Sequence, residues 1–179
     1  MRSTTLESTW NQRHGTCLIL HLQHHAGCGR ILGACTCNFG EVCMSYPQQL
    51  AELIEDFQSI DDRMERLEYV FDLASEVNEL PTSEWNDATR ILGCQSEAHV
   101  RVDVDQNNVR LFSGADSKLV QGLMGVLTIA IDDQPLEIAL SLTPEFAVEM
   151  GILNSLSPSR SNGFRNMFDK VMSDLQEVE

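Results

Sequence analysis

The change of hydrophobic period in the middle of the chain is the feature that most restricts its fold. Residues 50–77 carry apolar side chains three and four positions apart, which is the pattern of amphipathic helices. From Ala98 to Val104 the apolar residues alternate with polar ones, as on a strand with one buried face. Residues 119–131 return to helical spacing. The sequence therefore predicts helices that pack on a small β-structure.

Two amphipathic helices are predicted before the change of period. The first begins near Pro47 and ends near Ile60. Either Asp61 or Asp62 can cap the second, which extends to about Asn78. Because each helix has one apolar face, the pair forms a layer that another surface must cover.

The alternating run predicts a β-hairpin. Its first strand buries Ala98 and places His99 on the solvent side. Residues 106–108 read Gln-Asn-Asn, and Asn tolerates the positive φ angles of tight turns. Residues 109–113 alternate again as the returning strand.

Further helical segments are predicted after the hairpin. Asp116 is expected to cap a helix at 119–131, whose apolar residues cover more than one stripe and indicate burial against both the sheet and other helices. The remaining segments are a short one at 136–140, one from Pro144 to Met150 that ends at Gly151, and a last helix that begins near Ser161.

The charge of the chain excludes one class of function. The formal net charge is -15, and residues 1–43 contain three arginines and two glutamates, so the negative charge lies in residues 44–179. An acidic body repels the phosphate backbone, which argues against nucleic-acid binding. No run approaches 18 apolar residues, so no transmembrane helix and no membrane partner are predicted.

The composition changes just before Met44. Residues 1–43 hold five of the six cysteines and four of the five histidines. This extension could be a metal-binding tail, a transit peptide, or a disordered or non-native segment upstream of a true start at Met44. The cysteines lack the paired spacing of common zinc sites, and three arginines and two serines make a thin case for a transit peptide, so we favour the last. One domain is predicted at 44–179, in the cytoplasm, or in a plastid or mitochondrion if 1–43 is a transit peptide.

Cys94 is the only cysteine of that domain. It lies between a loop-like run at 80–85 and the first strand, where a loop can present a reactive group. A cysteine hydrolase would need a histidine base, and His99, the only candidate in the domain, is predicted to face solvent. Sulfur exchange between thiols needs only one accessible thiolate. A buried structural cysteine is the other interpretation.

Three motifs together resemble the SufE family of sulfur-acceptor proteins. They are Gly93-Cys94-Gln95-Ser96, the helix start at Asp116 followed by LVQGL at 119–123, and LSPSRSNG at 156–163. The likeness extends over essentially all of residues 46–177. In one departure, the family often has a large aromatic residue at the position of His99, after a β-branched residue where this chain has Ala98. That difference bears on partner affinity more than on chemistry.

The resemblance implies an α+β domain, with helices packed on one face of a small antiparallel sheet, similar to iron–sulfur scaffold proteins of the IscU type. It implies that Cys94 takes sulfane sulfur, as a persulfide, from a pyridoxal-phosphate-dependent cysteine desulfurase of the SufS type. The protein would stimulate that enzyme and pass sulfur to SUF scaffold proteins. It would be a carrier and activator, not an enzyme, and would bind no cofactor and no metal. A homodimer stays open.

Supporting residues follow from the same motifs. Gly93 would allow a tight turn beside the sulfur, although any turn can use a glycine. Gln95 and Ser96 could hydrogen-bond the loop or a persulfide anion. Arg160 is the candidate cation, either for the sulfur or for the desulfurase, unless it only fixes the loop before the last helix. Asp116 is expected to act mainly as a cap.

An iron–sulfur or metal scaffold is the alternative function. A cluster takes about four protein ligands, commonly cysteines. The domain at 44–179 offers one cysteine and one histidine, so this alternative needs the cysteines of residues 1–43.

Overall fold

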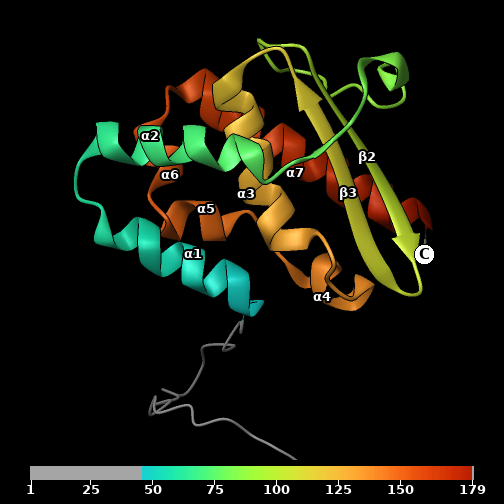
Figure 1. Ribbon diagram of the computed structural model, residues 1–179, viewed down its shortest axis with the longest axis horizontal. Helices are drawn as coiled ribbons and strands as arrows, with labels where there is room; N and C mark the ends of the chain where they lie inside the picture. Colours follow the sequence, from blue (N-terminus) through green and yellow to red (C-terminus); the bar gives the residue numbers. More distant parts are fainter. Residues whose placement is uncertain (1–45, 179) are drawn as a thin grey trace, which may run out of the picture. The chain divides into compact units, whose positions relative to one another are not determined.

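The computed structural model describes residues 46–178, and its elements follow the predicted order of helices, hairpin and helices (Figure 1). The helices are α1 (Gln48–Ser59), α2 (Arg63–Asp72), α3 (Lys118–Ile131), α4 (Leu136–Ser141), α5 (Glu145–Glu149), α6 (Ile152–Ser155) and α7 (Pro158–Val178). The strands are β1 (Asn78–Glu79), β2 (Ala98–Asp105) and β3 (Asn108–Ala115). Two 3-10 turns, η1 (Leu73–Ser75) and η2 (Thr82–Glu84), complete the described elements.

The predicted hairpin forms most of the sheet. β2 and β3 pair antiparallel, with Ala98 opposite Ala115, and Gln106 and Asn107 take positive φ angles at the turn. The short β1 pairs with β3 in parallel, so the sheet is mixed and its strand order is β1-β3-β2. The α+β class is therefore confirmed, with a short parallel strand added to the expected antiparallel pair.

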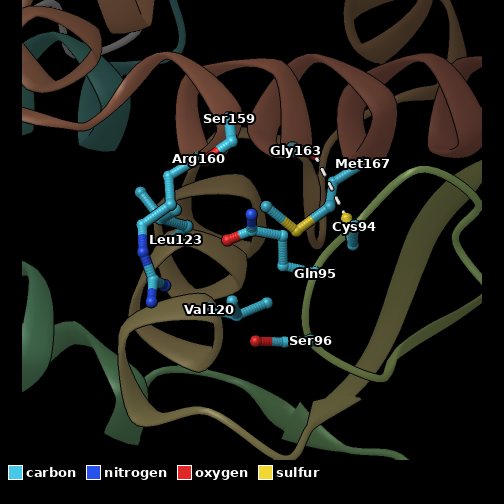
Figure 2. A pocket seen from close by; sticks show the side chains of 9 residues that line it. All are labelled: Cys94, Gln95, Ser96, Val120, Leu123, Ser159, Arg160, Gly163 and Met167. Atoms are coloured by element: carbon cyan, nitrogen blue, oxygen red, sulfur yellow. Dashed lines mark hydrogen bonds between the residues drawn. The ribbon is translucent and has the colours of Figure 1, made fainter.

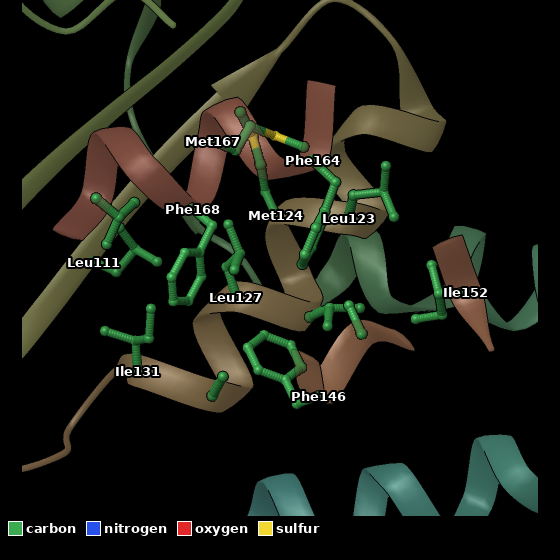
Figure 3. Close-up of a cluster of buried hydrophobic side chains, with 14 of the residues drawn as sticks. Leu111, Leu123, Met124, Leu127, Ile131, Phe146, Ile152, Phe164, Met167 and Phe168 are labelled. Atoms are coloured by element: carbon green, nitrogen blue, oxygen red, sulfur yellow. The ribbon is translucent and has the colours of Figure 1, made fainter. Parts of the chain in front are cut away.

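α3 is the central helix of the fold, and most of its side chains are buried. It packs against β3, α2 and η1, and it also contacts α1 and α7. Beside it, the ring of Phe146 on α5 meets those of Phe164 and Phe168 on α7 edge to face (Figure 3). Burial of each such side chain stabilises the fold by about 1.5–3 kcal/mol. This core holds α3 and α7 in fixed positions beside the hairpin.

The second face of the sheet is partly covered, and the prediction that His99 faces solvent is wrong. Its exposed fraction is 2 %. The ring of Trp85, which follows η2, stacks on the imidazole with ring centroids 4.6 Å apart. The indole N–H donates to the carbonyl of Leu80, which holds the ring in place. A loop therefore covers a strand position that the alternation assigned to water.

One of the two predicted helix caps is confirmed and the other is wrong. Asp62 caps α2, since its carboxylate accepts from the backbone N–H groups of Met64 and Glu65. The cap predicted at Asp116 is wrong, because Ser117 is the N-cap residue of α3. Asp116 instead continues the hairpin, and its N–H donates to the Glu97 carbonyl at 3.0 Å. α7 begins at Pro158, three residues before the predicted start, and proline is common at the first position of a helix.

Candidate functional site

Cys94 lies on a loop whose two ends are fixed by backbone hydrogen bonds. The N–H of Ile91 donates to the carbonyl of Ala98, and the N–H of Val100 donates to that of Thr89, both at 2.8 Å. Residues 92–97, which we term the Cys94 loop, leave the sheet between these bonds. The scaffold therefore presents the sulfur from a fixed base.

The side chain of His99 joins both ends of this base. Its Nδ1 lies 2.9 Å from the Thr89 hydroxyl, and its Nε2 lies 3.5 Å from the Glu97 carboxylate without forming a hydrogen bond. His99 is buried under Trp85 and is not among the residues that line the cavity at Cys94, so it does not share that cavity with the thiol as a general base for a hydrolase would.

Gly93 has a φ angle of +77°, in the left-handed region that favours glycine. The backbone at this turn approaches α7 closely, because a Cβ built on Gly93 would lie 2.5 Å from Nδ2 of Asn166. The positive φ angle favours glycine at this turn, and the contact adds a smaller penalty because the Asn166 side chain can move. This geometry agrees with the tight turn expected beside the sulfur.

The Cys94 loop, α3 and α7 line a partly open cavity of about 20 Å³ (Figure 2). Cys94 is half-buried at this cavity, and its S–H donates to the Gly163 carbonyl across 3.7 Å. The apolar lining comes from Val120, Leu123 and Met167, and the rest from Cys94, Gln95, Ser96, Ser159, Arg160 and Gly163. A cavity of this volume holds about one water molecule. It therefore offers room for about one additional heavy atom beside the sulfur.

Burial raises the pKa of the Cys94 thiol. The resting sulfur is therefore held as a neutral thiol at neutral pH, and the thiol is a weaker nucleophile than the thiolate. In Figure 2 the Arg160 side chain runs away from Cys94, and the Gln95 side chain lies between them in this view. Arg160 thus lines the same cavity as the sulfur, and its guanidinium group is directed away from Cys94.

The structure brings most of the predicted site residues together. Gln95, Ser96 and Arg160 line the cavity with Cys94, and Gly93 forms the turn next to it. The exposed Asp116 is not part of the cavity lining, and its backbone fixes the end of the Cys94 loop through the carbonyl of Glu97.

Sequence reasoning missed the residues that shape the cavity wall. Val120 and Leu123 belong to the apolar surface of α3, and Met167 to the apolar face of α7, so their pattern indicates a core. Gly163 ends the LSPSRSNG motif, and Val120 and Leu123 lie in the LVQGL motif, so these motifs are the signals that could have pointed to them. Met167 lies in neither motif, and the packing of α7 beside the loop brings it to the sulfur.

Within residues 46–178, no three side chains of His, Cys, Asp or Glu are arranged to hold a metal ion. The cysteines required by the metal-scaffold alternative, and the proposed start at Met44, lie outside the described residues and stay predictions. None of the described helices has the length and apolar character needed to cross a bilayer.

The fold and the site define a small α+β protein that carries one sheltered thiol on a loop. Residues 51–175 match SufE, a family described as an Fe-S metabolism associated domain. The chain therefore belongs to the SufE family.

Curated relatives share the matched region. The chain is 33 % identical over 134 residues to "SufE-like protein 1, chloroplastic/mitochondrial" of Arabidopsis thaliana. The alignment covers 74 % of this chain and 36 % of that protein. The chain is 26 % identical over 129 residues to "Cysteine desulfuration protein SufE" of Plasmodium falciparum, covering 69 % and 52 % of the two chains. The chain thus spans about a third and about a half of the lengths of these relatives.

A solved structure has the same fold. The solution structure of a hypothetical protein from Thermus thermophilus aligns with a TM-score of 0.65 and 21 % sequence identity. The alignment covers 75 % of this chain and 98 % of that one. At this identity the likeness concerns the fold alone.

Proposed function

We propose that this protein accepts sulfane sulfur from a cysteine desulfurase, holds it as a persulfide on Cys94 and passes it to iron–sulfur cluster assembly. Membership of the SufE family supports a sulfur-transfer role in iron–sulfur metabolism. The name of the Plasmodium relative, a cysteine desulfuration protein, supports the desulfurase as donor. The observation that carries the proposal is a half-buried thiol beside a cavity of about 20 Å³.

The chemistry needs no group beyond the two cysteines. The Cys94 thiol gives its proton to solvent, and the thiolate attacks the terminal sulfur of a protonated persulfide on the desulfurase. The S–S bond of the donor breaks, and the donor cysteine leaves as a thiolate. The new S–S bond holds the sulfur on Cys94. No oxidant or reductant is consumed, so the protein acts as a carrier that supports turnover of the desulfurase.

The cavity suits the product of that transfer. Its volume is sufficient for about one heavy atom, and Val120, Leu123 and Met167 keep that space apolar. Gln95 and Ser96 supply polar groups at its rim, which can donate to a persulfide anion. A sulfur held there is sheltered from other thiols and reductants while it waits for a recipient.

The raised pKa of Cys94 gives the partner a role. Because burial holds the resting thiol neutral, the loop must meet a less apolar or more cationic environment before the thiolate forms. A SufS-type desulfurase docked on the Cys94 loop would supply that environment. We propose that Arg160, whose side chain is directed away from the sulfur, contacts the desulfurase.

A persulfide assay tests the proposal. The protein is incubated with a SufS-type desulfurase and cysteine, and its intact mass is measured. We expect one added sulfur atom on Cys94 and a faster desulfurase, and Cys94→Ser should lose both. The matched control keeps Cys94 and replaces the other five cysteines with serine, and it should retain both effects. Stimulation that survives Cys94→Ser would reduce the protein to a passive activator and contradict the proposal.

The compartment and the recipient are parts of the same proposal. We propose SUF scaffold proteins as recipients and the cytoplasm as the location. A plastid or mitochondrion is the alternative, with residues 1–43 as a transit peptide, and the name of the Arabidopsis relative supports it. Mass analysis of the N-terminus of the native protein separates the two, because a processed transit peptide leaves a shortened chain.

A further inference from the structure

Gly163 lies in the sixth position of α7, where a glycine is unfavourable. A glycine inside a helix is destabilising by about 0.5–1 kcal/mol relative to alanine. Such a residue usually has a structural reason, either a positive φ angle or the close approach of another backbone. Neither reason applies at this position.

The two glycines of α3 are required by the close approach of another backbone. A Cβ on Gly122 would overlap the carbonyl oxygen of Val70, and one on Gly125 would overlap that of Leu73. By contrast, a Cβ on Gly163 would meet one heavy atom within 4 Å among the described residues beyond its own helix turn, and that atom is Sγ of Cys94 at 3.5 Å.

This distance is an ordinary van der Waals contact, so an alanine would fit beside the thiol. Gly163 also has no positive φ angle, since the described glycines with that conformation are Gly93 and Gly151. The packing of the resting protein therefore accepts a side chain here. Among the described residues, the missing methyl group leaves space beside the sulfur.

We propose that Gly163 is a specificity-determining residue that keeps open the space for the terminal sulfur of a Cys94 persulfide. The inference rests on the proposed function and assigns it a further residue. The added sulfur lies about 2.05 Å from Sγ. The cavity available to it is about 20 Å³, and Gly163 is one of the α7 residues that line it. A methyl group there would take up space that the sulfur needs, and would leave the thiol undisturbed.

The test uses the full chain, with the five cysteines before Met44 replaced by serine so that Cys94 is the only thiol. Inorganic tetrasulfide serves as the sulfur donor. The Cys94 thiolate attacks a terminal sulfur, the adjacent S–S bond breaks, and trisulfide leaves, so the donor supplies the sulfur without the desulfurase. Intact mass gives the ratio of persulfide to thiol, and thermal unfolding is measured for both forms.

We expect Gly163→Ala to lower the ratio of persulfide to thiol at equilibrium by about tenfold or more, since overpacking a filled site is unfavourable. Persulfidation should lower the melting temperature of Gly163→Ala and leave that of the parent unchanged. Asn162→Ala is the matched control, because Asn162 is the exposed neighbour on α7 and lies outside the cavity lining. It should behave as the parent does.

Equal persulfide ratios in Gly163→Ala and the parent would overturn the inference. A parent that takes up no sulfur would also overturn it. A Gly163→Ala chain that fails to fold would overturn it as well, because that result would show that packing itself requires the glycine. The desulfurase assay is then run on the same proteins. If tetrasulfide loads the parent and the desulfurase does not, the proposed function fails while the role of Gly163 stands. If the desulfurase loads the parent and Gly163→Ala equally, the role of Gly163 fails while the proposed function stands.

Discussion

The contact of α3 with α2 and the contact of α7 with the Cys94 loop both contain a helical glycine, and they use it differently. At the first, Gly122 brings the helix backbone against the carbonyl of Val70 with no room for a methyl group. At the second, Gly163 leaves 3.5 Å between a possible Cβ and the sulfur. The first glycine closes an interface, whereas the second leaves it incomplete. The comparison separates the rigid framework of the protein from the place where it accepts an atom.

The same substitution, glycine to alanine, tests the comparison at several positions. The largest effect is expected for Gly122→Ala, because its Cβ would overlap main-chain atoms that cannot rotate away. Separating α3 from α2 should lower the free energy of unfolding by about 3 kcal/mol or more. Urea unfolding followed by circular dichroism measures the loss. A loss under about 1 kcal/mol, which is an ordinary effect for a single substitution, would show that the interface is not closed.

A smaller effect is expected for Gly93→Ala, because its added Cβ meets a side chain that can move. The positive φ angle alone makes an L-residue unfavourable by about 1–2 kcal/mol. The Cβ would also lie 2.5 Å from Nδ2 of Asn166. Asn166→Ala and the double variant, measured by urea unfolding, separate the two terms. Removal of Asn166 should relieve the contact and leave the φ penalty, and full recovery of stability in the double variant would contradict a strained turn.

The residues that the sequence predicted correctly are those whose structure depends on near neighbours. The hairpin turn at Gln106 and Asn107 and the cap at Asp62 both follow from a few consecutive side chains. The positive φ of Gly93 belongs to the same group. Local patterns therefore predicted the elements, and the family motifs predicted most of the residues around Cys94.

The residues that the sequence predicted wrongly depend on distant parts of the chain. His99 alternates as a solvent-facing residue, and only the loop that carries Trp85 buries it. Asp116 is typical of a cap, and pairing with Glu97 keeps it in the hairpin instead. The motifs contain most of the residues that line the cavity, but they do not show that these residues meet, because Val120 and Met167 become neighbours through helix packing. Spacing in the sequence carries no information about that distance.

The reactivity of the Cys94 thiol tests the contact of α7 with the Cys94 loop. Burial disfavours the thiolate and raises the pKa of Cys94, so the fraction of thiolate at neutral pH falls below that of an exposed cysteine. With Cys94 as the only thiol, alkylation by iodoacetamide should be slower at pH 7 than in the urea-unfolded chain. Its rate should keep rising at a higher pH than the rate of the unfolded chain does. Coinciding pH profiles would mean that folding does not raise the pKa of Cys94 and would contradict this prediction.

The smallest expected effect has the opposite sign. In the thiol form, Gly163→Ala should raise the free energy of unfolding by up to about 1 kcal/mol, because alanine is the better helix former and its Cβ meets the sulfur at an ordinary distance. For a chain of this size that gain corresponds to a melting temperature higher by about 2–4 °C. Calorimetry of the reduced protein measures it, with Asn162→Ala as the control for a helix substitution outside the cavity. A stabilised thiol form would mean that the natural chain gives up helix stability at a buried helical position next to its sulfur. A destabilised thiol form would place Gly163 with Gly122 and remove the distinction between the two contacts.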